Sequence, residues 1–484
     1  MSTSNMATIE KPKIDEYPIH KAIASGNILE VKAKIKEYPS HINLPDKYNY
    51  SPLMTSSELG FANISKVFVE NGADINFKGG EYGSAALHIA AQKGKTEVLK
   101  FLLQCGSDVD MKNDIGIRPL HMAALNDHVD IVQLLTSYQC DLNAVCKIGD
   151  TGLHFAAYGG SIETVKLLIK KGASFNQPNQ GMLTPIHEAA MKGHIEVVKY
   201  LINNGVDIDC KGGKFGSSLL HLAAQVGKPE LVAVLLERGS NINIKNNMGS
   251  TPLLIAIRNK NYNIVKLLID QGCDIYAMDK ERNTVFHFAA FLGCFEIVKL
   301  LIEKGALLNE KNIFMSTPLR EAAIKGNFEI VKFLLENGAD VNSVDVDWNT
   351  SLHLAIRSDD FCIKTVKVLL DYGADYRKKN NAGFSVLDLC KEDKNWKIMD
   401  LILSKMMNDM EMKDSKRKHP KPVQFTLDEC IICDGHRDDV FALYPCGHAK
   451  TCEMCCLNLL ASPDINSVCP ICRSRIDDYK KIYV

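Results

Sequence analysis

The chain has 484 residues, with 57 Lys and Arg against 58 Asp and Glu, so its formal net charge is −1. This balance disfavours a nucleic-acid-binding protein, because neutralising phosphates requires an excess of basic residues. No apolar run approaches the roughly 18 residues that span a bilayer, and the first residues lack the apolar core of a secretory signal.

Cysteine density rises abruptly near residue 428. Eight of the 16 Cys lie in the last 55 residues, and the other eight are scattered over the preceding 429. Without an export signal, a disulfide framework is not expected, and the Cys are interpreted as buried thiols or metal ligands. The change in density predicts a domain boundary at about residue 428.

A phrase of the type TPLHxAAxxG recurs at steps of 33 or 34 residues, as in TGLHFAAYGG at 151–160 and TPIHEAAMKG at 184–193. Thr is a favourable N-cap, Pro is tolerated at the first helical position, and the Ala pair allows close helix packing. The following stretch, such as EVVKYLINNG at 196–205, has apolar residues at helical spacing and ends in a Gly suited to a left-handed cap. The pattern predicts one pair of helices per unit.

These units resemble the ankyrin repeat over residues 16–404. The twelfth copy, FSVLDLCKED, is degenerate, and it follows the eleventh copy after 35 residues because of a two-residue insertion around Ser358–Phe361. The resemblance implies a mainly α fold, a solenoid of about twelve helix-turn-helix units, preceded by a disordered segment at 1–15. Each unit buries its apolar face only against its neighbours. Such an array is expected to bind a substrate protein rather than to carry out chemistry.

Histidine recurs in the fourth position of the phrase. We interpret this series as local bonding within each unit, because it follows the packing pattern, rather than as a metal or catalytic site. The eight Cys of the array are interpreted as small buried hydrophobic residues. The His of the series are His20, His88, His121, His154, His187, His221, His287 and His353.

Residues 405–427 break the repeat and are predicted to be a flexible linker. The alternative is that Met399–Met412 extends a helix from the last repeat. Lys416, Arg417 and Lys418 could form a nuclear address, although a solvated linker is the favoured interpretation.

The last segment, 428–484, contains four pairs of metal-ligand residues, with spacing Cys-x2-Cys, Cys-x-His, Cys-x2-Cys and Cys-x2-Cys. Zinc prefers four tetrahedral S and N ligands, so four pairs fill two closed, structural sites. A module of this size has too small a core to fold without metal. We therefore predict two structural zinc ions.

The order of ligands, with His in the fourth position, resembles the RING finger. Two alternatives fit less well: a plant-homeodomain finger has its His in the fifth position, and two separate zinc ribbons do not explain a central His. The resemblance implies a small zinc-stabilised α+β domain, and in the RING family the pairs interleave. Cys456 is left over, and His436 is interpreted as an exposed loop residue. The resemblance implies that Cys430, Cys433, Cys452 and Cys455 hold one zinc, and that Cys446, His448, Cys469 and Cys472 hold the other.

The RING resemblance also implies contacts with a ubiquitin-conjugating enzyme through Ile432, Leu459 and Pro470, and a linchpin Arg473 that bridges this enzyme and ubiquitin. The alternative for the three apolar residues is that they only pack the small domain. Leu459 and a tail aromatic, Tyr483, match the inhibitor-of-apoptosis and double-minute classes. In these classes the aromatic reaches ubiquitin on the other protomer of a RING homodimer; the alternative is a chance aromatic at a frayed end.

The leading hypothesis is a RING-type ubiquitin-protein ligase without a covalent intermediate, located in the cytoplasm, with a nuclear location as the alternative if residues 416–418 act as a nuclear address. The array would bind the substrate, and the RING would recruit the ubiquitin-charged conjugating enzyme. The alternative is a non-enzymatic scaffold whose RING serves dimerisation or docking. An RNA-binding zinc protein is disfavoured, because residues 430–484 hold no basic patch.

Overall fold

The computed structural model describes residues 18–356, 361–415, 440–444, 448–452 and 478–482. The chain divides into two compact units, Met1–Lys280 and Glu281–Val484. Across the described residues the fold is mainly helical, with twelve successive pairs of helices, as predicted from the repeat. No helix in this part of the chain is long and apolar enough to cross a membrane.

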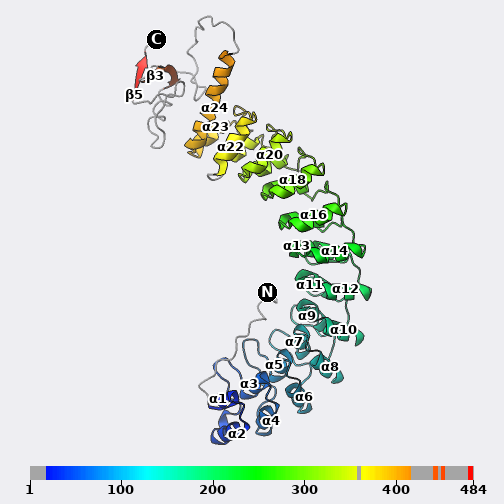
Figure 1. The fold of residues 1–484 in the computed structure, drawn as a ribbon. Helices are drawn as coiled ribbons and strands as arrows, with labels where there is room; N and C mark the ends of the chain where they lie inside the picture. Colours follow the sequence, from blue (N-terminus) through cyan, green and yellow to red (C-terminus); the bar gives the residue numbers. More distant parts are fainter. Residues whose placement is uncertain (1–17, 357–360, 416–439, 445–447, 453–477, 483–484) are drawn as a thin grey trace. The chain divides into compact units, whose positions relative to one another are not determined.

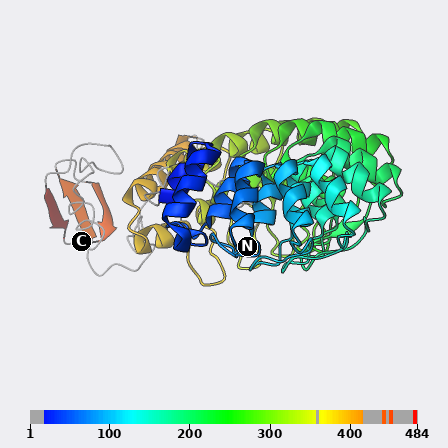
Figure 2. The ribbon, with the colours of Figure 1, turned by 90° about the horizontal axis from the view of Figure 1, so that it is seen from below.

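In the first unit, eight helix pairs stack so that the first helices form one layer and the second helices form another (Figure 1). Figure 2 shows the helices of this unit side by side with roughly parallel axes. The pairs are α1 (Pro18–Ala24) and α2 (Ile28–Glu37), α3 (Pro52–Leu59) and α4 (Ala62–Glu70), α5 (Ala86–Gln92) and α6 (Thr96–Gln104), α7 (Pro119–Leu125) and α8 (Val129–Ser137), α9 (Gly152–Gly159) and α10 (Ile162–Lys170), α11 (Pro185–Lys192) and α12 (Ile195–Asn203), α13 (Leu219–Val226) and α14 (Pro229–Glu237), and α15 (Pro252–Arg258) and α16 (Tyr262–Asp270).

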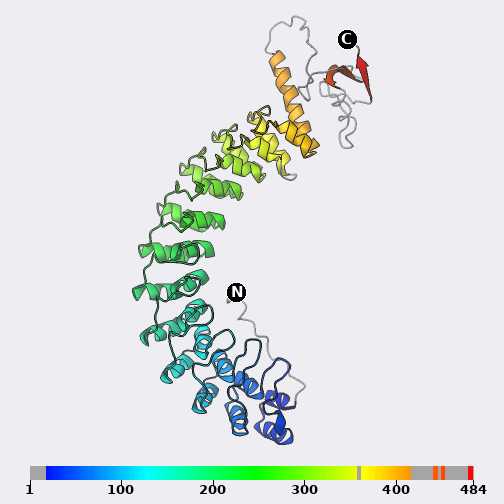
Figure 3. The same cartoon turned by 180° about the vertical axis from the view of Figure 1, so that it is seen from behind.

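The first unit also contains a 3-10 turn, η2 (Pro39–His41), and a short antiparallel ladder of β1 (Lys211–Gly212) and β2 (Ser217–Ser218). In the second unit four more pairs follow (Figure 3). They are α17 (Val285–Phe291) and α18 (Phe295–Glu303), α19 (Pro318–Ile324) and α20 (Phe328–Glu336), α21 (Ser351–Ala355) and α22 (Phe361–Asp371), and α23 (Val386–Glu392) and α24 (Trp396–Ser415).

The helix ends follow the predicted chemistry. The Thr151 hydroxyl accepts the N–H of His154 at the start of α9, and Gly160, with φ of 74°, ends that helix. Most second helices end two residues before a Gly with positive φ, such as Gly205 at 93° after α12, a conformation that costs Gly least. Local sequence therefore determines where each helix starts and stops.

The core lies between and within the helix pairs. The Ala pair is completely buried in the units that have it, as for Ala156 and Ala157 of α9, and so are inward-facing apolar residues of the second helices, such as Val165 and Leu168 of α10. Burying apolar area contributes about 25 cal/mol per Å². Because each pair covers its neighbour in this way, stability is shared between adjacent repeats.

The C-terminal part of the second unit contains a three-stranded antiparallel sheet in the order β4-β3-β5. Its strands are β3 (Val440–Tyr444), β4 (His448–Cys452) and β5 (Asp478–Ile482).

Candidate functional site

Most histidines of the series tie neighbouring repeats together. Nδ1 of His88 accepts the backbone N–H of Ala85 at 3.2 Å, and Nε2 lies 3.0 Å from the carbonyl oxygen of Ile117 in the next repeat. Because Nδ1 accepts a hydrogen bond, Nε2 carries the ring proton and donates it to that carbonyl. The imidazole therefore bridges the start of its own helix and the turn of the following repeat.

The same crossing bond recurs in other repeats. Nε2 of His121 lies 3.0 Å from the carbonyl of Ala144, and Nε2 of His221 lies 2.8 Å from that of Ser250. The prediction that each His bonds within its own unit is right for Nδ1 and wrong for Nε2. Sequence pattern alone did not show this, because the partner is a main-chain carbonyl 23 to 30 residues away.

Burial keeps these rings neutral. Desolvation lowers the pKa of His88 to about 4 and that of His121 to about 3, with only partial compensation from their carbonyl partners. A ring with both nitrogens engaged and no charge at neutral pH serves a structural role. The histidine series of the array is therefore a structural feature of the fold.

The array cysteines are mostly unreactive. Burial raises the thiol pKa to about 12 for Cys140, Cys210, Cys273 and Cys390, so thiolate is scarce at neutral pH. The prediction of burial is confirmed for Cys140, Cys146, Cys273 and Cys390. It is wrong for Cys105, which is exposed because it follows the last residue of α6 at a repeat end, and Cys210 and Cys294 are only half-buried.

In the tenth repeat Arg320 fills the position of the His. Its guanidinium forms an ion pair with Asp345 of the following turn, with both side chains buried. The sequence shows Arg320 in the repeated phrase, but it does not reveal that Asp345 is its partner. This pair replaces the His-to-carbonyl bond as the tie between two repeats.

Two of the eight predicted zinc ligands, His448 and Cys452, lie at the two ends of β4. The other predicted residues of the module lie outside the described residues. These are Cys430, Ile432, Cys433, Cys446, Cys455, Leu459, Cys469, Pro470, Cys472, Arg473 and Tyr483.

A register shift separates the two ligands of β4. His448 pairs with Leu443 and Cys452 pairs with Val440, and the register shifts between Phe441 and Ala442, where β4 has one residue more than β3. Residues four apart on a regular strand share a face, but an extra residue between them reverses the alternation. The register therefore places positions 448 and 452 on opposite faces of the sheet, which fits the predicted assignment of these ligands to two different zinc ions.

The C-terminal tail forms the edge strand β5 against β3. Val440 pairs with Ile482 and Tyr444 pairs with Asp478, so the strand continues to the residue before Tyr483. The hypothesis of a frayed end is wrong up to Ile482, despite the charged sequence DDYKK. Pairing with β3 satisfies the backbone of the tail, which is why charged side chains do not prevent the strand.

Helix α24 extends eleven residues beyond the predicted end of the solenoid at residue 404. The alternative hypothesis that Met399–Met412 extends a helix is therefore right, and the helix continues to Ser415. The prediction of a flexible linker is wrong for residues 405–415. The reason is visible in the sequence: Met406 lies 33 residues after Gly373, where earlier repeats have their Gly cap. Without a residue suited to positive φ, the helix continues.

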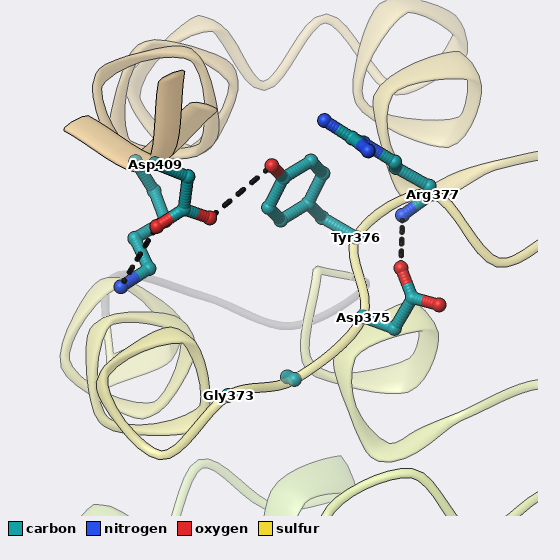
Figure 4. Close-up of a pocket in the computed structure, with 7 residues that line it drawn as sticks. Gly373, Asp375, Tyr376, Arg377 and Asp409 are labelled. Atoms are coloured by element: carbon teal, nitrogen blue, oxygen red, sulfur yellow. Dashed lines mark hydrogen bonds and ion pairs between the residues drawn. The ribbon is translucent and has the colours of Figure 1, made fainter. Parts of the chain in front are cut away.

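The extension is fastened to the preceding turn. A hollow of about 430 Å³ opens between α24 and that turn, and the Tyr376 ring points across it toward α24 (Figure 4). The Tyr376 hydroxyl donates to Asp409 at 3.3 Å, and Lys405 pairs with Asp409 at 3.5 Å. The residues that line the hollow are Gly373, Ala374, Asp375, Tyr376, Arg377, Lys405 and Asp409.

This hollow contains two carboxylates and two cationic side chains, so its charges offset one another. Burial also raises the pKa of Tyr376, which keeps its hydroxyl protonated and able to donate. We assign the hollow a structural role in holding α24.

Comparison with protein families matches both parts of the chain. Residues 426–479 match the model described as a zinc finger of the C3HC4 type (RING finger). The model described as ankyrin repeats (3 copies) matches residues 87–179, 120–212, 153–246, 220–312 and 286–380.

Similar curated proteins share short segments with this chain. It is 34% identical over 109 residues to the rat (Rattus norvegicus) Ankyrin repeat and SAM domain-containing protein 6, covering 22% of this chain and 12% of that protein. It is 38% identical over 72 residues to the Drosophila melanogaster E3 ubiquitin-protein ligase mind-bomb, covering 15% and 5%. It is 42% identical over 65 residues to the Homo sapiens E3 ubiquitin-protein ligase NEURL1B, covering 13% and 11%. The chain therefore spans only a small part of each of these relatives.

Proposed function

Because this chain belongs to the ankyrin-repeat family and carries a C-terminal RING-type zinc finger, we propose that it is a ubiquitin-protein ligase. The observation that carries the proposal is the RING match over residues 426–479, together with the full set of ligand and contact positions in that segment. The two relatives named as E3 ubiquitin-protein ligases support it. We place its action in the cytoplasm.

In this proposal two zinc ions hold the module in its fold and take no part in bond formation. The donor set fits them, since seven thiols and one imidazole are the ligands that tetrahedral zinc prefers. The opposite faces occupied by positions 448 and 452 support two separate sites rather than one shared site.

Ubiquitin transfer would depend on positioning. Ile432, Leu459 and Pro470 would contact the conjugating enzyme, and Arg473 would use its fork of donors to hold ubiquitin against that enzyme. A fixed thioester orientation favours attack by a substrate Lys without a nucleophile from the ligase. The array would supply the substrate, and the helical extension of α24 would replace part of the flexible tether between the two functions.

The test is self-modification of the full chain with activating enzyme, a panel of conjugating enzymes, ubiquitin and ATP. Ile432→Ala should abolish activity and retain zinc, because it removes a contact and no ligand. Ile465→Ala makes the same change elsewhere in the module and should remain active. Equal activity of wild type and Ile432→Ala across the panel would overturn the contact assignment, and an inactive wild type across the panel would favour the scaffold.

We further propose that Tyr483 reaches ubiquitin held by a second protomer. The support is that β5 holds the tail in the sheet up to the preceding residue. Removing only Tyr483 and Val484 leaves β5 intact and should cut ubiquitin discharge, while Tyr483→Phe should be tolerated. Mixing this truncated chain with Ile432→Ala should restore part of the activity, because in a two-fold dimer each tail serves the opposite site. Mixed dimers without recovered activity would overturn the cross-protomer role.

A further inference from the structure

Three neighbouring turns of the second unit expose apolar side chains at their tips. The turns join α18 to α19, α20 to α21 and α22 to α23. Between 38% and 56% of each of these residues is exposed to solvent. We call this set the fingertip patch; it consists of Ile313, Phe314, Met315, Val346, Trp348 and Phe384.

The three tips are joined through their main chains. The N–H of Val346 donates to the carbonyl of Phe314 at 3.2 Å, and the N–H of Asn381 donates to the carbonyl of Asp347 at 2.9 Å. The exposed side chains of one tip are therefore held beside those of the next. The result is one surface spread over three repeats, with a fixed spacing between its parts.

Two members of the patch occupy an unfavourable backbone conformation. Met315 has φ of 59° and Trp348 has φ of 62°, at a turn position where Gly116, Gly149 and Gly249 occur in other repeats. A residue with a Cβ in this left-handed region costs roughly 1–2 kcal/mol. Bulky residues are rare there.

Folding gains little in return for this strain. Trp348 is 56% exposed and Met315 is 41% exposed, so much of each side chain remains in water. Gly or Asn would satisfy the same turn at lower cost. Met182 of the first unit has a similar φ and is 67% exposed, so strain by itself marks no binding site. Met315 and Trp348 differ because they lie among four further exposed apolar side chains on joined tips, and such a cluster is better explained by contact with a partner than by stability of the array.

The charge of the three tips defines the chemistry of that partner. Across residues 313–315, 346–348 and 381–384 the one charged side chain is the exposed carboxylate of Asp347. Asp347 directly precedes Trp348 in the turn, and a carboxylate together with an aromatic ring at one tip favours a Lys or Arg side chain. An acidic or phosphorylated partner would meet this carboxylate with no cation on the tips to offset it.

We propose that the fingertip patch binds a polypeptide segment that presents aromatic or aliphatic side chains beside a Lys or Arg. This proposal rests on the proposed function only in treating that polypeptide as the substrate. Trp348 and Phe314 act as the apolar anchors, since interface energy concentrates in large aromatic residues. Asp347 selects the neighbouring basic residue.

The test pans a phage-displayed random dodecapeptide library on the full chain. Wild type should enrich peptides with aromatic or aliphatic residues next to Lys or Arg. Asp347→Lys should shift the enriched peptides toward Asp and Glu while keeping their apolar residues. Met182→Ala, which truncates an exposed Met at the same turn position in the first unit, with φ of 58°, should leave the selection unchanged.

A second variant separates binding from folding. Trp348→Asn should lower the affinity for a synthetic peptide selected on the wild type at least about tenfold. The thermal unfolding midpoint of this variant should equal or exceed that of the wild type, because Asn tolerates positive φ. The proposal is overturned by peptides without shared composition, by equal selection with Asp347→Lys, or by unchanged affinity of Trp348→Asn. It is also overturned if sedimentation shows that the patch is covered by a second copy that Trp348→Asn releases.

Peptide binding needs no ubiquitin, so the two proposals fail separately. A reporter protein fused to the selected peptide should be ubiquitylated by wild type and spared by Trp348→Asn. Selective peptide binding by a chain that ubiquitylates nothing would overturn the proposed function but would still support peptide binding by the fingertip patch.

Discussion

The guanidinium of Arg320 lies 2.6 Å from the carboxylate of Asp345, and only 4% and 10% of their side chains are exposed. The other carboxylate oxygen of Asp345 accepts the N–H groups of Asp347 and Asn349 at 2.9 and 2.8 Å. One buried ion pair thus joins two repeats and shapes the turn that carries Trp348. Burial lowers the pKa of Arg320, which shows the desolvation that Asp345 has to offset.

Removing one partner of this pair should be costly. Arg320→Ala leaves the Asp345 carboxylate buried without its cation, and we expect a loss of about 3–5 kcal/mol of unfolding free energy. Thermal and urea unfolding of the full chain, followed by circular dichroism, measure the change. Lys332→Ala, which breaks an exposed ion pair with Glu336, serves as the control and should have little effect. Similar small losses for both variants would contradict the assignment of Arg320.

Acid should destabilise the array through its histidines. Because the pKa of His88 is lowered from 6.5 to about 4, the unfolded chain binds a proton between these values that the folded chain does not. The contribution of the neutral His88 ring to stability is therefore complete above pH 6.5. About 3 kcal/mol of unfolding free energy is lost as the pH falls to 4. His88→Gln should be less stable at pH 8 but should lose less stability between pH 6.5 and 4. Urea unfolding at a series of pH values tests this, and parallel profiles would contradict it.

The zinc content should follow the two-site assignment. Metal analysis of the full chain should give two zinc ions, and Cys452→Ala should lower this to one or fewer, because loss of a ligand opens a closed site. Cys456→Ala removes a neighbouring thiol that has no assigned ligand role and should retain both ions. One ion in wild type, or equal loss in the two variants, would show that the ligand set is wrong.

The attachment of α24 should depend on one hydroxyl group. Tyr376→Phe removes the bond to Asp409 and should weaken the docking of residues 405–415 by about 1 kcal/mol. Hydrogen exchange of this segment in the full chain should become faster. Tyr372→Phe removes a hydroxyl that bonds to Glu336 at 3.4 Å on the surface, and should leave exchange of α24 unchanged. Equal exchange in Tyr376→Phe and wild type would mean that this contact does not hold the helix.

By itself, the sequence determined the twelve helix pairs and their ends. Thr or Ser before most first helices, the Ala pair, and a Gly after most second helices act within a few residues, so their effects can be read locally. The spacing of Cys and His also predicted a RING-type module, and the family match confirms this type, while the assignment of the individual zinc ligands stays a prediction. Even the extension of α24 is explained locally, by Met406 at a position where other repeats have Gly.

Only the tertiary structure decided which distant groups these side chains meet. The His in the fourth position of the repeated phrase could be recognised within one repeat, but its carbonyl partner lies in the next repeat. In the same way, the pairing of Arg320 with Asp345 depends on how two repeats stack. The same holds for the pairing of β5 with β3 and for the three tips that form the fingertip patch. Contacts between residues tens of positions apart depend on packing geometry and on which backbone groups remain unpaired, and neither quantity is contained in a local pattern of residue types.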